Sequence, residues 1–291
     1  MRTSSGNPKR VLFIAAFAAF LATFNETYLN VAFPNIMSAF STDIGTVQWL
    51  ATAYMLGAAV MVPISAFLYR NIKTKTLFLL ATGLLILGSI ICALAVSFPM
   101  LLAGRIIQSI GTGVLIPVGM NVTLEVAPRR KLGLYLGIIG SMTAVGPSAS
   151  IILAGGLLTF FGWNVLFLVY GALALICCIC AAFMIGDIAE LTRPKLDITS
   201  TILISFALIG ILYGISTSFS GNIPVSGLAA ALGIACLVFF VRRQKKIPSP
   251  LINLQPLGVR PFAIGLIINM LKLTIIFAMN IIMPLYLQSA L

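Results

Sequence analysis

Long stretches of apolar residues, separated by short polar segments, run along the whole chain. Each is close to or above the roughly 20 residues that an α-helix needs to cross a bilayer. The apolar positions follow one another without the alternation of membrane β-strands, so the pattern predicts helices rather than a barrel. Nine stretches are found, near 11–33, 47–69, 76–97, 100–124, 132–158, 163–186, 198–218, 224–241 and 262–287. The chain is therefore predicted to be an all-α integral membrane protein.

Composition supports a membrane protein. Hydrophobic residues make up 60% of the 291 residues and charged residues only 8%, whereas a soluble domain carries roughly 25% charged residues. The first apolar stretch is too long for the roughly 7–15 residues at the centre of a signal peptide. We expect it to remain as a membrane anchor.

The net charge of +12 is distributed in a way that predicts orientation rather than nucleic-acid binding. Sixteen of the 18 Lys and Arg residues lie in the N-terminal tail and after every second apolar stretch, and the alternate loops carry none. Cytoplasmic loops are the ones enriched in Lys and Arg, so the N-terminus is predicted to be cytoplasmic. Phosphate recognition would need a continuous basic face, so no nucleic-acid partner is expected.

Two polar segments divide the chain. The predicted organisation is a six-span bundle, a cytoplasmic linker, an inserted two-span hairpin, a basic cytoplasmic linker, and the first span of an incomplete C-terminal bundle. These parts cover residues 1–186, 187–197, 198–241, 242–261 and 262–291, respectively. Asn30 and Pro34 in the first span are matched by Asn280 and Pro284 in the ninth, a weak repeat that suggests two related halves.

Enzyme chemistry is not indicated. The chain has no histidine and no phosphate-binding glycine loop, and its five cysteines all lie within apolar stretches. We therefore expect no enzymatic activity, no metal and no cofactor.

Glu26 is the one carboxylate well inside an apolar stretch. A charge there is costly, so it normally faces a cavity or a partner. Burial disfavours an ionised carboxylate and a nearby Arg favours it, and competition between the two could switch a proton carrier. We interpret Glu26 as a proton or cation site. The alternative is a static polar contact between helices.

Arg105 lies inside the fourth span at a depth similar to that of Glu26. Because Arg keeps its proton, it would act as a fixed positive charge. We expect it to contact Glu26 or the backbone of the first span, with Gln108 one turn away on the same face. The alternative is that Arg105 extends to the outer interface.

Other polar residues within the spans could line a cavity. Lys272 lies in the middle of the ninth span and should face water or a carboxylate. Asn25, Asn30 and Asn269 add polar groups to the same two helices. Each Asn could equally form a helix-helix hydrogen bond.

Glycine and proline positions predict close packing or motion of the fourth and fifth spans. Glycine lets helices approach closely, and proline removes a backbone hydrogen bond and bends a helix. Packing without gating is the alternative interpretation. The residues are Gly111, Gly113, Gly146, Pro147, Gly155 and Gly156.

Four stretches resemble the major facilitator superfamily, specifically its fourteen-span drug/proton antiporters. They cover residues 24–34, similar to the first-span motif; 102–113, similar to the Arg-x-x-Gln-Gly-x-Gly motif; 146–167, similar to the antiporter motif; and 250–288, similar to the first span of the second half. The resemblance implies a major-facilitator-type helical bundle, alternating access powered by protons, and a coupling role for Arg105. It explains the extra hairpin as the insertion that separates fourteen-span from twelve-span members.

The chain departs from the family pattern in several places. Asn25 occupies the position of the usual first-span Asp, and the acid is displaced to Glu26. Ser109 replaces a glycine, and a second Gly-Pro expected near Ser150 is missing. The loop after the second span lacks the family's Asp and glycines and instead carries Arg70, Lys73 and Lys75.

The sequence thus predicts the first nine spans of a multi-pass exporter in the bacterial inner (plasma) membrane. Its expected partners are the lipid bilayer, protons, an amphipathic drug-like or cationic small molecule, and the missing C-terminal spans. The alternatives are a non-transporting scaffold or receptor, a degenerate half-transporter, and an exporter of an endogenous metabolite.

Overall fold

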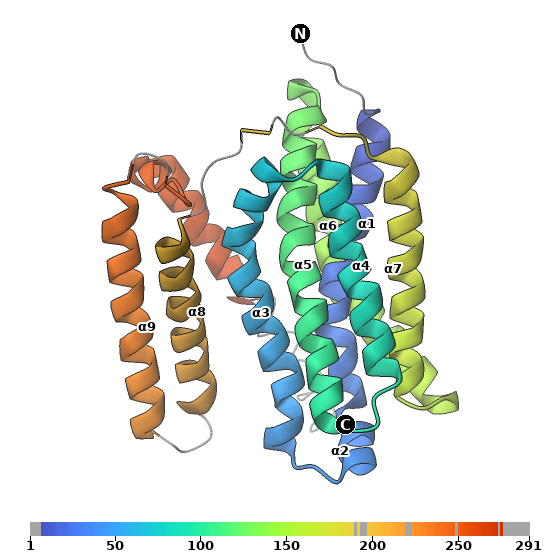
Figure 1. Cartoon of the computed structure of the whole chain (residues 1–291). Helices are drawn as coiled ribbons and strands as arrows, with labels where there is room; N and C mark the ends of the chain where they lie inside the picture. The colour runs from blue at the N-terminus through green and yellow to red at the C-terminus, as the bar shows by residue number, and fades with distance from the viewer. Residues whose placement is uncertain are drawn as a thin grey trace. The chain divides into compact units, whose positions relative to one another are not determined.

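A computed structural model describes residues 7–188, 191–192, 197–218, 223–247, 250–272 and 274–275. The regular elements in these ranges are helices, which confirms the predicted all-α fold (Figure 1). They are α1 (Pro8–Thr27), η1 (Tyr28–Ala32), α2 (Phe33–Phe40), α3 (Ile44–Asn71), α4 (Thr74–Ala93), α5 (Phe98–Val126), η2 (Arg129–Lys131), α6 (Leu132–Phe160), α7 (Asn164–Met184), α8 (Ile198–Ser218), α9 (Ile223–Gln244) and η3 (Gln255–Gly258). The chain forms two compact units, Met1–Phe240 and Val241–Leu291.

Eight candidate membrane spans are present in the described ranges, and they coincide with the first eight apolar stretches. The first candidate span, Pro8–Phe40, joins α1, η1 and α2. Part of the segment 34–46, between the first two predicted apolar stretches, is therefore helical. The ninth stretch is described only as far as residue 275, with a helix over 260–272 in the second unit. Asn280 and Pro284 lie outside the described residues.

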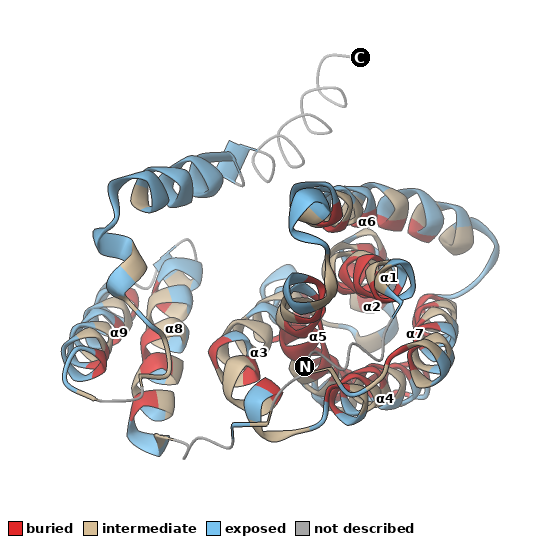
Figure 2. Cartoon of the chain, turned by 90° about the horizontal axis from the view of Figure 1, so that it is seen from above, coloured by how far each residue is buried: buried red, intermediate tan, exposed pale blue. Residues whose placement is uncertain are grey.

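Helix α1 forms the core of the bundle. It packs against α5, α6 and α7, while α5 also packs against α3 and α4. Viewed along the bundle, the buried positions gather on α1, α5 and the inward sides of α4 and α7 (Figure 2). A helix with neighbours around most of its circumference needs no polar face, so the apolar sequence of α1 suits its position.

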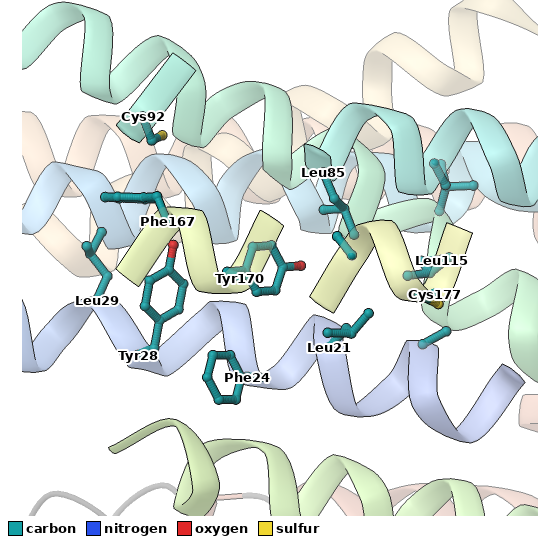
Figure 3. Close-up of a cluster of buried hydrophobic side chains, with 14 of the residues drawn as sticks. Leu21, Phe24, Tyr28, Leu29, Leu85, Cys92, Leu115, Phe167, Tyr170 and Cys177 are labelled. Atoms are coloured by element: carbon teal, nitrogen blue, oxygen red, sulfur yellow. The ribbon is translucent and has the colours of Figure 1, made fainter. Parts of the chain in front are cut away.

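Aromatic rings fix the contact between α1 and α7 (Figure 3). Tyr28 stacks on Tyr170 with ring centroids 5.7 Å apart, and Phe167 meets Tyr28 edge-on, also at 5.7 Å. Phe24 lies one turn along and stacks on Tyr170 at 6.3 Å. Offset and edge-on arrangements of this kind suit the charge distribution of aromatic rings.

The first span changes from an α-helix to a 3₁₀-helix at the Asn30–Pro34 motif. Proline has no backbone N–H, so Pro34 cannot donate to the Asn30 carbonyl four residues earlier. The Phe33 N–H donates to that carbonyl instead, which gives the tighter i to i+3 turn of η1. The motif thus introduces a local change of helix type just after Glu26.

Asp43 begins α3 outside the apolar stretches. Its side chain accepts a hydrogen bond from the Thr46 N–H at 3.2 Å, as an N-cap residue should. Hydrogen bonds from the Thr46 hydroxyl and N–H lower the pKa of the exposed Asp43 carboxyl below its usual value. The carboxylate is therefore the form that caps the helix.

Two glycines of α5 allow neighbouring helices to approach closely. A Cβ at Gly111 would lie 2.5 Å from the Ala81 carbonyl oxygen of α4, and one at Gly113 would lie 2.5 Å from the Ala58 carbonyl oxygen of α3. Close packing is therefore observed at both positions. A gating role for them stays a prediction.

Helix α6 has one close contact and one open face. A Cβ at Gly146 would lie 2.9 Å from the Phe20 carbonyl oxygen, so this glycine, which precedes Pro147, brings α6 against α1. Gly155 and Gly156 have no neighbouring heavy atom within 4 Å of an added Cβ. Within the described part of the chain, no other element packs closely against these two residues, and their role in packing or gating stays a prediction.

Helices α8 and α9 form a hairpin in which the two helix backbones pack closely against each other. A Cβ at Gly210 would lie 2.9 Å from the Ala229 carbonyl oxygen, and one at Gly214 would lie 2.9 Å from the Ser226 carbonyl oxygen. Helix α8 also packs against α3, where Trp49 and Tyr213 meet with ring centroids 5.8 Å apart. The hairpin is therefore a compact pair attached to the bundle through α3.

Replacing Gly111 with Ala is expected to lower the free energy of unfolding by about 1–3 kcal/mol, because the new methyl group would collide with the Ala81 backbone. The matched control is Gly137→Ala in α6, where no heavy atom lies within 4 Å of an added Cβ. The thermal unfolding midpoint of the detergent-solubilised complete protein measures both. Equal midpoints would contradict the packing of α5 against α4.

Candidate functional site

Arg105 lies in the interior of the helical bundle. Its side chain has 0% exposure, and its guanidinium donates to groups on three helices. Nη1 donates to the Asn25 side-chain oxygen at 2.8 Å and to the Asn25 carbonyl at 3.3 Å, and Nε donates to the Leu50 carbonyl at 3.4 Å. Arg105 of α5 therefore holds α1 and α3 together.

Gln108 extends this network to α4. Its side-chain oxygen accepts from Arg105 Nη1 at 3.0 Å, and its side-chain nitrogen donates to the Ser89 hydroxyl at 2.9 Å. The Ser89 hydroxyl in turn donates to the Leu85 carbonyl at 2.7 Å. Since Gln108 lies one turn beyond Arg105, the predicted placement of the two on one face of the helix is observed.

Tyr54 of α3 covers the guanidinium. The Arg105 carbon Cζ lies 4.2 Å from the centre of the Tyr54 ring, a distance typical of a cation–π interaction. The Tyr54 hydroxyl donates to the Thr112 hydroxyl at 2.8 Å, which holds the ring in place. Tyr28 lies farther away, with its ring centre 5.9 Å from Cζ.

All the hydrogen-bond acceptors of Arg105 are uncharged. Within the described residues, no carboxylate forms an ion pair with it. Asn25, its main partner, is itself 0% exposed. The bundle therefore holds Arg105 with an amide at a position where a carboxylate could have neutralised it.

Glu26 follows Asn25 but faces another direction. Neighbouring helical positions point about 100° apart, and Glu26 is partly exposed whereas Asn25 is buried. Within the described residues, no ion pair joins Glu26 to Arg105. Glu26 therefore lies on a partly exposed side of α1, away from the hydrogen bonds that Asn25 makes with Arg105.

A hydrogen bond joins α1 to α6 next to Glu26 in the sequence. The Thr27 and Ser150 hydroxyls are 2.6 Å apart. Ser150 lies in the region where the family pattern has a second Gly-Pro pair. This chain therefore has a hydrogen bond between two side chains at the position of that pair.

The expected contact between Arg105 and the backbone of the first span is observed, while an ion pair with Glu26 is not. The full burial of Arg105 excludes its extension to the interface. Asn30 is exposed in η1. Asn269 and Lys272 are exposed within the second unit, and their role in lining a cavity stays a prediction.

Sequence reasoning did not anticipate Tyr54, Ser89 and the Leu50 carbonyl as partners of this network. Each polar side chain lies within an apolar stretch, which is the signal that could have identified it. Tyr54 at 2% exposure and Ser89 at 1% are polar groups that need a partner inside the bundle. A backbone carbonyl such as that of Leu50 leaves no trace in the sequence.

Arg70 lies in the last turn of α3, Lys73 lies between α3 and α4, and Lys75 lies in the first turn of α4. The Lys73 ammonium forms an ion pair with Asp187, which follows α7, at 3.4 Å. Both side chains are about half exposed or more, at 65% and 46%, so the pair contributes little to stability. It joins two parts of the same bundle at the predicted cytoplasmic end.

Arg105→Ala is expected to lower the free energy of unfolding by about 1–3 kcal/mol or more, because it leaves buried carbonyl oxygens without donors. Arg105→Lys should recover only part of this loss, since an ammonium cannot replace a planar fork that reaches three helices. Arg129→Ala, at an exposed position before α6, is the control. Thermal unfolding of the purified protein compares the three, and an unchanged midpoint for Arg105→Ala would refute the network.

Known proteins with related sequences are transporters. The chain is 33% identical over 283 residues to the lincomycin resistance protein LmrB of Listeria monocytogenes and 30% identical over 285 residues to the uncharacterized MFS-type transporter YcnB of Bacillus subtilis. These matches cover 96% and 97% of this chain and 60% of each relative. The riboflavin transporter RibZ of Clostridioides difficile is 26% identical over 287 residues, or 96% of this chain and 60% of RibZ.

Solved structures show the same fold. The POT family transporter PepTSo matches with a TM-score of 0.60 and 15% identity over 81% of this chain and 52% of its own. A bacterial homologue of the human lysosomal transporter Spinster matches with a TM-score of 0.55 and 18% identity over 83% of this chain and 62% of its own. The chain thus spans about 60% of the length of the curated relatives.

The model of the Major Facilitator Superfamily matches residues 15–291, nearly the whole chain. With the all-helical bundle and the transporter relatives, this match shows that the chain belongs to the Major Facilitator Superfamily of membrane transporters.

Proposed function

We propose that the chain is the N-terminal part of a proton-coupled antiporter that exports amphipathic, drug-like or cationic compounds by alternating access. It would belong to the fourteen-span branch, reside in the bacterial plasma membrane and have a cytoplasmic N-terminus. The name of LmrB, a lincomycin resistance protein, supports export of drug-like compounds. Because the chain covers 60% of that relative, transport requires the spans that follow in the complete protein.

One observation carries the proposal. Glu26 is a partly exposed carboxylate on the central helix of the bundle, and no ion pair holds it within the described residues. A carboxylate in a membrane helix is costly and is retained where a proton or a cation uses it. Glu26 is free to exchange a proton, whereas a carboxylate tightly paired with Arg would be held ionised.

The mechanism follows from competition for Glu26. When the cavity is open to the acidic outside, Glu26 takes up a proton and a bound cation leaves. When the cavity is open to the cytoplasm, Glu26 loses the proton and becomes an anion that attracts the next cation. The form of the transporter with a proton on Glu26 favours one orientation of the two halves, and the form with a bound cation favours the other. Alternating access requires this difference in affinity between the two orientations.

The rest of the predicted site has supporting roles in this proposal. Asn30, exposed near the end of α1, would offer a polar contact to the substrate. Asn269 and Lys272 would line the cavity from the second half. The glycines of α5 and Gly146 with Pro147 of α6 would let the helices adjust as the cavity changes sides.

Export of an endogenous metabolite is a second candidate, favoured by the similarity to the riboflavin transporter RibZ. Riboflavin is uncharged at neutral pH, so a carrier of such compounds would use Glu26 only for the proton. Competition between lincomycin and riboflavin for export by the complete protein distinguishes these substrate classes. A scaffold or receptor without transport activity would export neither.

Glu26→Gln is expected to reduce proton-driven export at least tenfold, because an amide can neither bind and release a proton nor attract a cation. The measurement is proton efflux from energised inverted vesicles on addition of lincomycin, using the complete gene product. Asp43→Asn is the matched control, since it makes the same change at an exposed helix cap and Asn caps a helix about as well as Asp. Undiminished lincomycin-dependent proton efflux in Glu26→Gln would refute the proposed mechanism.

A further inference from the structure

The turn that follows α9 concentrates positive charge at the end of a candidate membrane span. That span ends at Gln244. The exposed cations within two residues of this end are Arg242, Arg243, Lys245 and Lys246. The second unit, residues 241–291, contains no Asp or Glu. No carboxylate side chain within this unit can therefore neutralise the cluster.

Hydrogen bonds fold this turn into a defined shape. Gln244 is only 4% exposed, and its side-chain oxygen accepts from the Ile252 N–H at 3.1 Å. The N–H groups of Lys246 and Ile247 both donate to the Arg243 carbonyl, at 2.9 Å and 3.2 Å. These bonds hold the linker against the end of α9.

The folded linker encloses a hollow of about 410 Å³ within the second unit. Ligand pockets usually measure roughly 300–1,000 Å³. The lining combines one cation and three side-chain amides with apolar surface. The residues of this linker hollow are Lys245, Gln244, Asn253, Gln255, Ile247, Pro250 and Leu254.

This combination of groups suits an amphipathic anion. A cation and amide groups can bind a phosphate, and apolar side chains beside them suit the glycerol and the first carbons of an acyl chain. The hollow directly follows a candidate membrane span, so it lies at the depth of lipid headgroups. Orienting a span requires only positive charge, and a folded hollow beside the charge is not needed for it.

We propose that the linker hollow binds the headgroup of an anionic phospholipid. Lys245 contacts the phosphate, and Ile247, Pro250 and Leu254 contact the glycerol and the adjoining chain. The inference goes beyond the proposed transport function and does not depend on Glu26. The bound lipid would supply the negative charge that the second unit lacks.

Two variants separate a built site from general attraction to a negative membrane. Lys245→Gln removes the cation of the linker hollow. Gln244→Ala removes the hydrogen bond to the Ile252 N–H and changes no charge. Arg129→Gln is the matched control for Lys245→Gln, because it removes an exposed cation before α6 that does not line the hollow.

The measurement is photolabelling of the complete protein in phosphatidylcholine vesicles by phosphatidylglycerol with a diazirine in its headgroup. Mass spectrometry of peptic peptides locates the label, which we expect on residues 244–255. Unlabelled phosphatidylglycerol should displace it, and added phosphatidylcholine should not. Lys245→Gln should lower this labelling about fivefold, the usual effect of one interfacial cation. Gln244→Ala should lower it to a similar extent, and Arg129→Gln should leave it unchanged.

Equal labelling of residues 244–255 in all three variants would overturn the inference. A loss in Lys245→Gln with full labelling in Gln244→Ala would also overturn it, because charge alone would then account for binding. Displacement by inorganic phosphate as effective as that by phosphatidylglycerol would assign the hollow to a soluble phosphate instead of a lipid.

Asn253→Asp provides the test if Gln244→Ala fails to fold. It keeps an oxygen that can accept from the Gln255 N–H, as Asn253 does at 3.0 Å, and places an anion in the lining of the hollow. We expect it to lower labelling at least fivefold by repelling the phosphate. Full labelling of Asn253→Asp would contradict a phosphate at this place.

Discussion

The structure of the first bundle depends on how it accommodates one buried cation. Arg105 is fully enclosed, and a charge in such a place must be hydrogen-bonded or paired. The bundle supplies carbonyl oxygens, two side-chain amides and an aromatic face, and these groups come from α1, α3 and α5. The demand of the guanidinium for acceptors therefore dictates which helices must meet at this depth.

Close backbone approach makes that arrangement possible. Gly111 and Gly113 let α4 and α3 reach α5 within one turn of the network, and in a membrane such packing replaces the hydrophobic effect as the attraction between helices. The aromatic contacts of Tyr28 and Tyr170 close the side toward α7. Tight packing and polar satisfaction thus support each other, because each carbonyl that reaches Arg105 belongs to a helix held close by small or aromatic residues.

Much of this fold could be predicted from the sequence, and part of the site could not. The eight described spans follow from apolar length alone, since hydrocarbon leaves the backbone few alternatives to a helix. The contact of Arg105 with the first span followed from matching depths. Its neutral coordination did not, because the pattern specifies depth along a helix and not direction around it. The lack of a close neighbour at Gly155 and Gly156 in the described residues could not be predicted for the same reason: glycine spacing indicates that a helix could pack, but not that another helix lies there.

The direction in which a side chain points from α1 also explains why an acid at position 26 can have a different role from an acid at position 25. At position 25 a carboxylate would point at the guanidinium, where a fully enclosed ion pair would bind its proton only at great cost. At position 26 the carboxylate points to a partly exposed side of the same helix and forms no ion pair with the cation within the described residues. In the proposed function, holding the cation and exchanging a proton would then be separate tasks of adjacent residues. Because the first requires rigidity and the second requires access, a rotation of about 100° around one helix is sufficient to separate them.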